Sequence, residues 1–113
     1  MNDPIVIVSA VRTPMGAFQG VFGSLTAPQL GAVAIKTAVE RAGIAPELVE
    51  EVLFGCVLPA GLGQAPVRQA ALQAGLPLSA GCAMISKVCG SGMKATMVGH
   101  DGSVRTRIVG DKV

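Results

Sequence analysis

Aromatic residues are nearly absent from this sequence, whose 113 residues include three Phe and neither Trp nor Tyr. Proteins that bind single-stranded nucleic acid stack the bases on aromatic side chains, so this class of function is excluded. Charge is also sparse: charged residues make up 14% of the chain, the net charge is +2, and the basic residues are spread out. We therefore expect no basic surface for nucleic acid or for a membrane.

Cysteine, histidine and long apolar runs are scarce as well. The chain has three Cys, one His and no C-x-x-C pair, so neither a disulfide framework nor a metal site is expected. No apolar run is long enough to span a bilayer, and the N-terminus lacks the pattern of a signal peptide. These absences predict a cytoplasmic protein with no metal and no membrane partner.

Hydrophobic residues, in contrast, make up half of the chain, which favours parallel strands covered by helices. The segment Pro4–Val11 is a continuous, mostly β-branched run and is predicted to be a buried central strand. Further strands are predicted over residues 51–57 and 82–88, and helices over residues 27–42, 65–74 and 91–100, with a helical turn at 46–50. The order β-α-β-α-β-α indicates an α/β fold, with a parallel or mixed sheet and helices on its faces.

The ends of the first helix are marked in the sequence. Thr26 and Gln29 form a capping box, and Gly43 is placed to end the helix. Gly31 lowers helix propensity by about 1 kcal/mol relative to alanine. Its presence predicts close packing at that point.

The most informative stretch is M-I-S-K-V-C-G-S-G-M-K-A, residues 84–95. It reads as a strand, a tight turn and the start of a helix, with Cys89 at the turn. Helix starts carry unpaired N–H groups and the positive end of the dipole, which favour the thiolate, the nucleophilic form of cysteine. A buried structural thiol is the alternative interpretation of the same pattern. We identify Cys89 as a candidate nucleophile toward a carbonyl or thioester.

The other two cysteines and the single histidine have simpler interpretations. Cys56, inside a strand, and Cys82, at a strand start, are predicted to be packing residues. His100 lies about 16 Å along the helix from Cys89, too far to take its proton. Arg12 and Arg68 are candidates for binding an acidic ligand, and a structural ion pair of Arg68 with a glutamate of residues 47–51 is equally plausible.

Two glycine-containing stretches invite comparison with nucleotide-binding loops. In G-S-G-M-K-A-T, Met93 precedes Lys94 and Ala95 follows it, so the phosphate-loop pattern fails. The pair Gly61 and Gly63 has no third glycine at the required place. Nucleotide binding is not expected.

Four segments, taken together, resemble a known family. I-V-S-A-V-R-T-P-M-G, residues 7–16, resembles the N-terminal strand and turn of thiolases, the acetyl-CoA acetyltransferase family. V-L-F-G-C-V, G-Q-A-P-V-R-Q-A and V-C-G-S-G-M-K-A look like its next three signatures, in order; they span residues 52–57, 63–70 and 88–95. The resemblance covers residues 1–101, interpreted as part of a thiolase N-terminal domain, and leaves residues 102–113 as a divergent tail.

The resemblance implies a thiolase-like fold, of which this chain is an incomplete N-terminal half, and an acyltransferase of fatty acid metabolism. Cys89 matches the cysteine that takes the acyl group from an acyl-CoA such as acetyl-CoA, and its backbone N–H matches an oxyanion donor. Coenzyme A enters as the thioester substrate, and no cofactor is implied. In the family a histidine and a second cysteine from the other half assist, and the subunits form homo-oligomers.

Competing interpretations remain open at the level of sequence. One is a non-catalytic remnant that associates with thiolase-fold subunits. Another is a relative of ketoacyl synthases, although G-S-G-M-K-A after the cysteine fits thiolases better. The chain is expected to be a truncated or frame-shifted product, inactive alone. Its tail is predicted to fray or to form an edge strand over residues 104–109.

Overall fold

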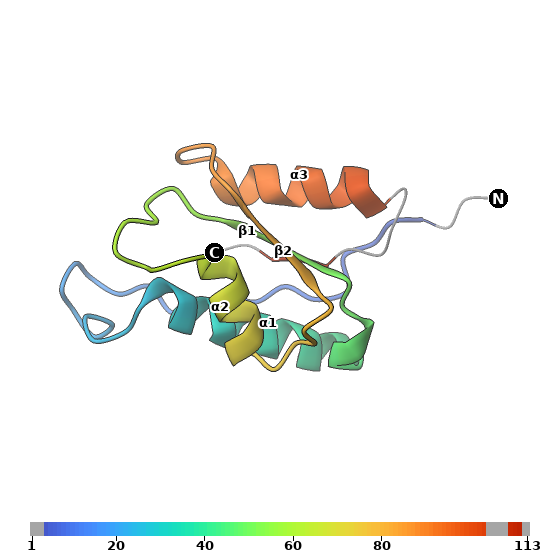
Figure 1. Cartoon of the computed structure of the whole chain (residues 1–113), viewed down its shortest axis with the longest axis horizontal. Helices are drawn as coiled ribbons and strands as arrows, with labels where there is room; N and C mark the ends of the chain where they lie inside the picture. Colours follow the sequence, from blue (N-terminus) through green and yellow to red (C-terminus); the bar gives the residue numbers. More distant parts are fainter. Residues whose placement is uncertain (1–3, 104–108, 112–113) are drawn as a thin grey trace.

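Three short parallel strands form the centre of this computed structural model, which describes residues 4–103 and 109–111. The elements follow in the order α1 (Ala27–Ala42), η1 (Pro46–Leu48), β1 (Glu51–Gly55), α2 (Pro66–Gln73), β2 (Gly81–Ile85), α3 (Ser91–Ser103) and β3 (Val109–Asp111). The strand order is β2-β1-β3, with Leu53 paired to Ala83 on one side and to Gly110 on the other. Figure 1 shows α3 on one side of the sheet and α1 and α2 on the other. The predicted α/β class is confirmed.

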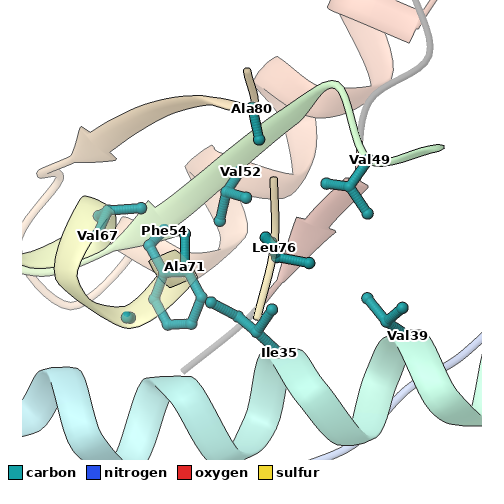
Figure 2. Packing of buried hydrophobic residues seen from close by; sticks show 10 residues of the cluster. Ile35, Val39, Val49, Val52, Phe54, Val67, Ala71, Leu76 and Ala80 are labelled. Carbon is teal, nitrogen blue, oxygen red and sulfur yellow. The ribbon is translucent and has the colours of Figure 1, made fainter. Parts of the chain in front are cut away.

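The core lies between β1 and the α1–α2 pair (Figure 2). Residues 52–55 of β1 are all buried, as expected for a strand covered on both faces. The cluster consists of Ile35, Val39, Val49, Val52, Phe54, Val67, Ala70, Ala71, Leu76 and Ala80. The cluster therefore holds β1 in place, and both β2 and β3 pair with this strand.

The predicted ends of α1 are confirmed. The Thr26 hydroxyl accepts from the Gln29 backbone N–H at 3.3 Å, and the Gln29 side chain accepts from the Thr26 N–H at 2.8 Å. Gly43 ends the helix in the left-handed conformation, with φ of 67°. Gly31 is buried, and a Cβ built there would lie 3.4 Å from the Ala70 Cβ and from the Phe54 ring, so the predicted close packing is also found.

The predicted central strand at Pro4–Val11 is wrong. These residues form no strand, and most of them are exposed; Ile7, for example, is 82% exposed. Both edges of β1, the strand at the centre of the sheet, are taken by β2 and β3, so the N-terminal residues cannot pair with it. The predicted order beginning with a strand is replaced by one beginning with α1.

Two further boundaries differ from the prediction. The strand expected over residues 82–88 is β2, which ends at Ile85, because the chain turns at residues 87–90. In the tail, residues 104–108 lie outside the described residues, so the edge strand predicted there is not assessed. Val109–Asp111 form β3, at the edge of the sheet beside β1.

Candidate active site

The turn between β2 and α3, residues 86–90, is here called the elbow. It brings the chain from the carboxyl end of β2 directly into the first turn of α3. The Gly90 N–H donates to the Lys87 carbonyl at 2.9 Å, and the Ser91 N–H donates to the Val88 carbonyl at 3.3 Å. Val88 has φ of 47°, a left-handed conformation that is strained for a β-branched residue. The strand–turn–helix geometry predicted around Cys89 is confirmed.

Ser91 holds this strained turn closed from inside. Its side chain is buried, and its hydroxyl accepts from the Lys87 N–H at 2.9 Å while donating to the Val88 carbonyl at 2.6 Å. Both hydrogen bonds join neutral groups and are partly shielded from water. Each contributes about 1 kcal/mol to the stability of the fold. Ser91 therefore acts as a clamp on the residues that flank Cys89.

Gly55 positions the elbow from the opposite side. It is the last residue of β1, and a Cβ built on it would lie 2.5 Å from the Ser91 carbonyl carbon and 2.7 Å from the Gly92 Cα. Backbone thus packs directly on backbone where β1 ends and α3 begins. Only glycine permits this approach.

Cys89 itself is exposed at the outside of the elbow. The backbone N–H groups of Gly90 and Ser91 already bind carbonyl groups of the elbow. Cys89 forms an isolated parallel β-bridge with Lys87, and among the described loop and turn hydrogen bonds none has the Cys89 N–H as its donor. One residue thus presents an accessible thiol together with an uncommitted donor, the pair of groups needed to attack a carbonyl and to hold the resulting oxyanion.

We expect Cys89 to be the first thiol modified when the native chain meets limiting iodoacetamide. Cys56 and Cys82 are both partly covered, and the Cys82 thiol donates to the Ala80 carbonyl at 3.6 Å. Exposure should make alkylation of Cys89 at least about tenfold faster. Peptide mapping by mass spectrometry measures this ratio, with the urea-unfolded chain as the control. Equal labelling of the three thiols in the native chain would contradict the prediction.

The other two cysteines differ in how well they match their predicted packing roles. Cys82 packs against the core cluster, as predicted. Cys56 stands just beyond β1 rather than inside a strand, and its N–H donates to the Ile85 carbonyl at 3.0 Å. Its half-buried side chain lines a cavity of about 90 Å³ between the N-terminal ends of α1 and α2. The prediction of a core residue is therefore too strong for Cys56.

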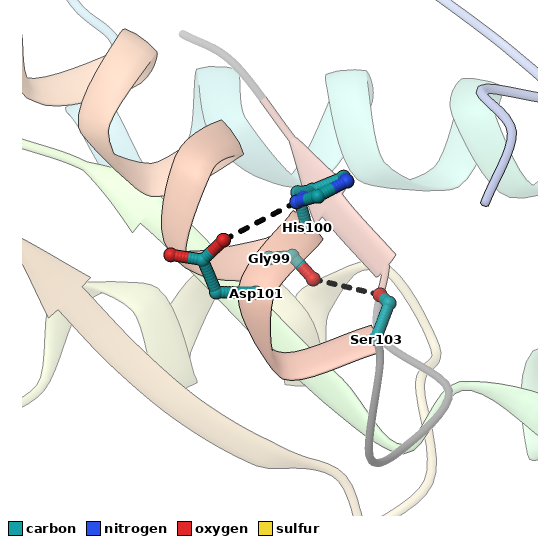
Figure 3. Close-up of polar contacts among 4 residues, drawn as sticks. All are labelled: Gly99, His100, Asp101 and Ser103. Carbon is teal, nitrogen blue, oxygen red and sulfur yellow. Dashed lines mark hydrogen bonds and ion pairs between the residues drawn. The ribbon is translucent and has the colours of Figure 1, made fainter.

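His100 lies near the far end of α3 and pairs with Asp101 through Nδ1 and Oδ1 at 3.2 Å (Figure 3). Its side chain is 62% exposed, and it lines a cavity of about 310 Å³ with the N-terminal segment, α1 and the C-terminal half of α3. Cys89 lines neither this cavity nor the smaller one. His100 is thus not placed to act on the Cys89 thiol.

The arginines have different surroundings. Arg68 donates to the backbone carbonyls of Ala80 at 2.7 Å and Leu78 at 2.8 Å, so it ties α2 to the segment that leads into β2. This bonding replaces the glutamate pair considered for Arg68. Arg12 is exposed in the N-terminal segment.

Residues 4–103 and 109–111 contain no group of three or more His, Cys, Asp or Glu side chains that could hold a metal ion. In that part of the chain, no helix combines the length and the apolar character needed to cross a bilayer.

Three positioning residues were missed by the sequence interpretation: Val88, Ser91 and Gly55. The G-S-G motif after Cys89 signalled a turn, but nothing in it indicates that the serine is buried. The contact between Gly55 and α3 joins residues far apart in the chain. An isolated glycine at a strand end was the only available signal.

Comparison with known proteins gives a consistent result. The family model described as "Thiolase, N-terminal domain" matches residues 5–107. The cytosolic acetyl-CoA acetyltransferase of Gibberella zeae is 58% identical over 96 residues, which are 85% of this chain and 24% of that protein. The mitochondrial acetyl-CoA acetyltransferase of Bos taurus is 57% identical over 96 residues, 85% of this chain and 23% of that protein.

A solved structure shows the same similarity in three dimensions. The Acat5 thiolase of Ascaris suum, in complex with coenzyme A, superposes with a TM-score of 0.87 at 42% identity. The match covers 89% of this chain and 27% of that one. This chain thus spans about a quarter of the length of the relatives it matches. The proposed division between residues 1–101 and a tail stays a prediction.

Proposed function

The chain belongs to the thiolase family, and we propose from this premise that Cys89 is the nucleophile of an acyltransferase acting on acyl-CoA thioesters such as acetyl-CoA. The observation that carries the proposal is the coincidence, at one residue, of an exposed thiol and an uncommitted backbone N–H. The strained elbow and the Ser91 clamp hold these two groups in a fixed relation.

In the proposed step, the Cys89 sulfur attacks the carbonyl carbon of the thioester after its proton passes to a base. The carbonyl oxygen becomes an oxyanion, which the Cys89 N–H stabilises by hydrogen bonding. The bond between that carbon and the coenzyme A sulfur then breaks. Coenzyme A leaves as a thiol after taking up a proton, and the acyl group remains on Cys89 as a new thioester.

The base for this step is proposed to lie outside the described residues. The chain has a single histidine, His100, and it lines a cavity that excludes Cys89. The histidine and second cysteine implied by the thiolase resemblance would come from the part of the relatives that this chain does not span. The cytoplasmic location also stays a prediction, because the matched relatives include cytosolic and mitochondrial proteins.

Acetyl-CoA is expected to acetylate the purified chain slowly at Cys89. Intact-mass measurement should detect one acetyl group, sensitive to hydroxylamine as a thioester is, and peptide mapping should place it on Cys89. The Cys89→Ser variant should lose the adduct, while Cys82→Ser, the matched control at a half-buried thiol, should keep it. If the base lies outside the described residues as proposed, steady-state thiolysis or condensation should not be detectable.

Three outcomes would count against this proposal. Acetylation that persists in Cys89→Ser would place the nucleophile elsewhere. Full turnover by the purified chain, free of host thiolase, would contradict the proposal that the base lies outside the described residues. Complete absence of acetylation in a chain that still alkylates fastest at Cys89 would favour the second proposal, a non-catalytic chain that associates with thiolase-fold subunits. That second proposal is supported by the apolar side chains left on the surface.

A further inference from the structure

The peptide group that joins Val88 to Cys89 carries the N–H proposed to hold the oxyanion. It is the central peptide of a turn over residues 87–90, which is closed by the bond from the Gly90 N–H to the Lys87 carbonyl at 2.9 Å. Of the two central residues of this turn, only Val88 has a positive φ, 47°. This is the pattern of a type II′ turn, whose first central position ordinarily belongs to glycine. A β-branched residue thus occupies a backbone position that suits glycine.

Hydrogen bonds to Ser91 hold Val88 in this conformation. The side chain of Val88 is 67% exposed, so its packing does little to offset the strain. Its carbonyl, in contrast, accepts from the Ser91 hydroxyl at 2.6 Å and from the Ser91 N–H at 3.3 Å. The Ser91 hydroxyl also accepts from the Lys87 N–H at 2.9 Å, so it is held from both sides of the turn. Because Ser91 is buried, these bonds draw the Val88 carbonyl toward the inside of the elbow.

The direction of this carbonyl determines the direction of the Cys89 N–H. The described residues contain no cis peptide bond, and in a planar trans peptide the C=O and the N–H point to opposite sides. With the Val88 carbonyl held inward, the Cys89 N–H points outward, toward the side on which the thiol is exposed. Rotation of this one peptide group would relieve Val88 and turn the N–H away from the thiol.

We propose that Ser91 is a positioning residue for acylation: its hydroxyl, acting through the Val88 carbonyl, keeps the Cys89 N–H directed at the oxyanion. The strain at Val88 turns the peptide group away when this hydroxyl is absent. Attack by the thiol on a carbon that develops no oxyanion does not need the bond. The inference rests on the proposed nucleophile, Cys89, but it does not require that the acyl donor be an acyl-CoA.

Two reagents that modify the same thiol test this role in the full chain, with peptide mapping to follow Cys89. With p-nitrophenyl acetate, the sulfur loses its proton to solvent and attacks the carbonyl carbon; an oxyanion forms, p-nitrophenolate leaves, and an acetyl thioester remains. Iodoacetamide loses iodide to the attacking sulfur and forms no oxyanion. In Ser91→Ala, acylation should slow by at least about tenfold while alkylation keeps its rate. Ser103→Ala is the matched control, because it removes a hydroxyl bonded to the Gly99 carbonyl at 2.7 Å, and it should change neither rate.

A second substitution keeps the proposal testable even if Ser91→Ala is less stable. Glycine adopts a positive φ without strain, so in a Val88→Gly background the change Ser91→Ala should slow acylation by a smaller factor. Equal factors in the two backgrounds would overturn the proposal, as would equal slowing of acylation and alkylation, or unchanged acylation, in Ser91→Ala alone. A chain that reacts at Cys89 with p-nitrophenyl acetate as expected, but not with acetyl-CoA, would support the role of Ser91 while contradicting the proposed acyl-CoA substrate.

Discussion

Replacing Gly55 by alanine should cost the chain about 3 kcal/mol or more of its free energy of unfolding. The added Cβ would overlap the backbone where Ser91 joins Gly92, and no rotamer change can relieve a collision with main-chain atoms. Either the C-terminal end of β1 or the start of α3 has to shift. Since natural domains are stable by only about 5–15 kcal/mol, urea denaturation should show a large shift of the midpoint.

The same substitution should disturb the candidate site. If the start of α3 moves, the Ser91 hydroxyl loses its bonds to Lys87 and Val88, and the elbow opens. Acetylation of Cys89 by acetyl-CoA should then slow, because the thiol and the backbone N–H of Cys89 lose their fixed relation. Gly81→Ala is the matched control, because a Cβ at this strand residue would meet its nearest atom, in Glu51, at an ordinary 3.5 Å. Equal stability of the two variants would contradict the contact between β1 and α3.

The parts of the fold that were predicted correctly are those specified by neighbouring residues. The capping box of α1 joins Thr26 to Gln29, and Pro66 marks the first turn of α2, so each signal acts within one helical turn. The elbow was also predictable, because strand, turn and helix follow one another within residues 81–103. For the same reason, the sequence correctly predicts Cys89 in the turn between a strand and a helix.

The errors concern the choice of strand partners. β propensity favours residues 5–8, but a strand exists only where a neighbour offers an open edge, and this depends on the whole sheet. In the structure, one edge of β1 pairs with Val109–Asp111, although these residues have weak strand propensity. The burial of Ser91 and the approach of Gly55 to α3 are likewise contacts between distant segments. The hydrophobic pattern within a short stretch of sequence carries no information on such contacts.

The surface area of the chain leads to a final expectation, self-association. The accessible surface is 7674 Å², whereas a folded monomer of 11.4 kDa exposes roughly 5,800 Å². Large apolar side chains contribute to this larger surface; Phe18 is 93% exposed, Met15 88% and Val21 82%. Covering them is favourable by about 25 cal/mol for each Å² of apolar surface removed from water.

We therefore expect the purified chain to form dimers or larger assemblies at micromolar concentration, and to bind a hydrophobic dye while native. Light scattering coupled to size exclusion measures the mass, and dilution should shift it toward the monomer. Phe18→Ser should weaken association, because it removes the most exposed of these side chains, whereas Ser24→Asn, in the same exposed turn, should not. A monomeric parent chain that binds no dye and melts sharply would contradict the proposed association, since it would show that the chain tolerates this apolar surface in water.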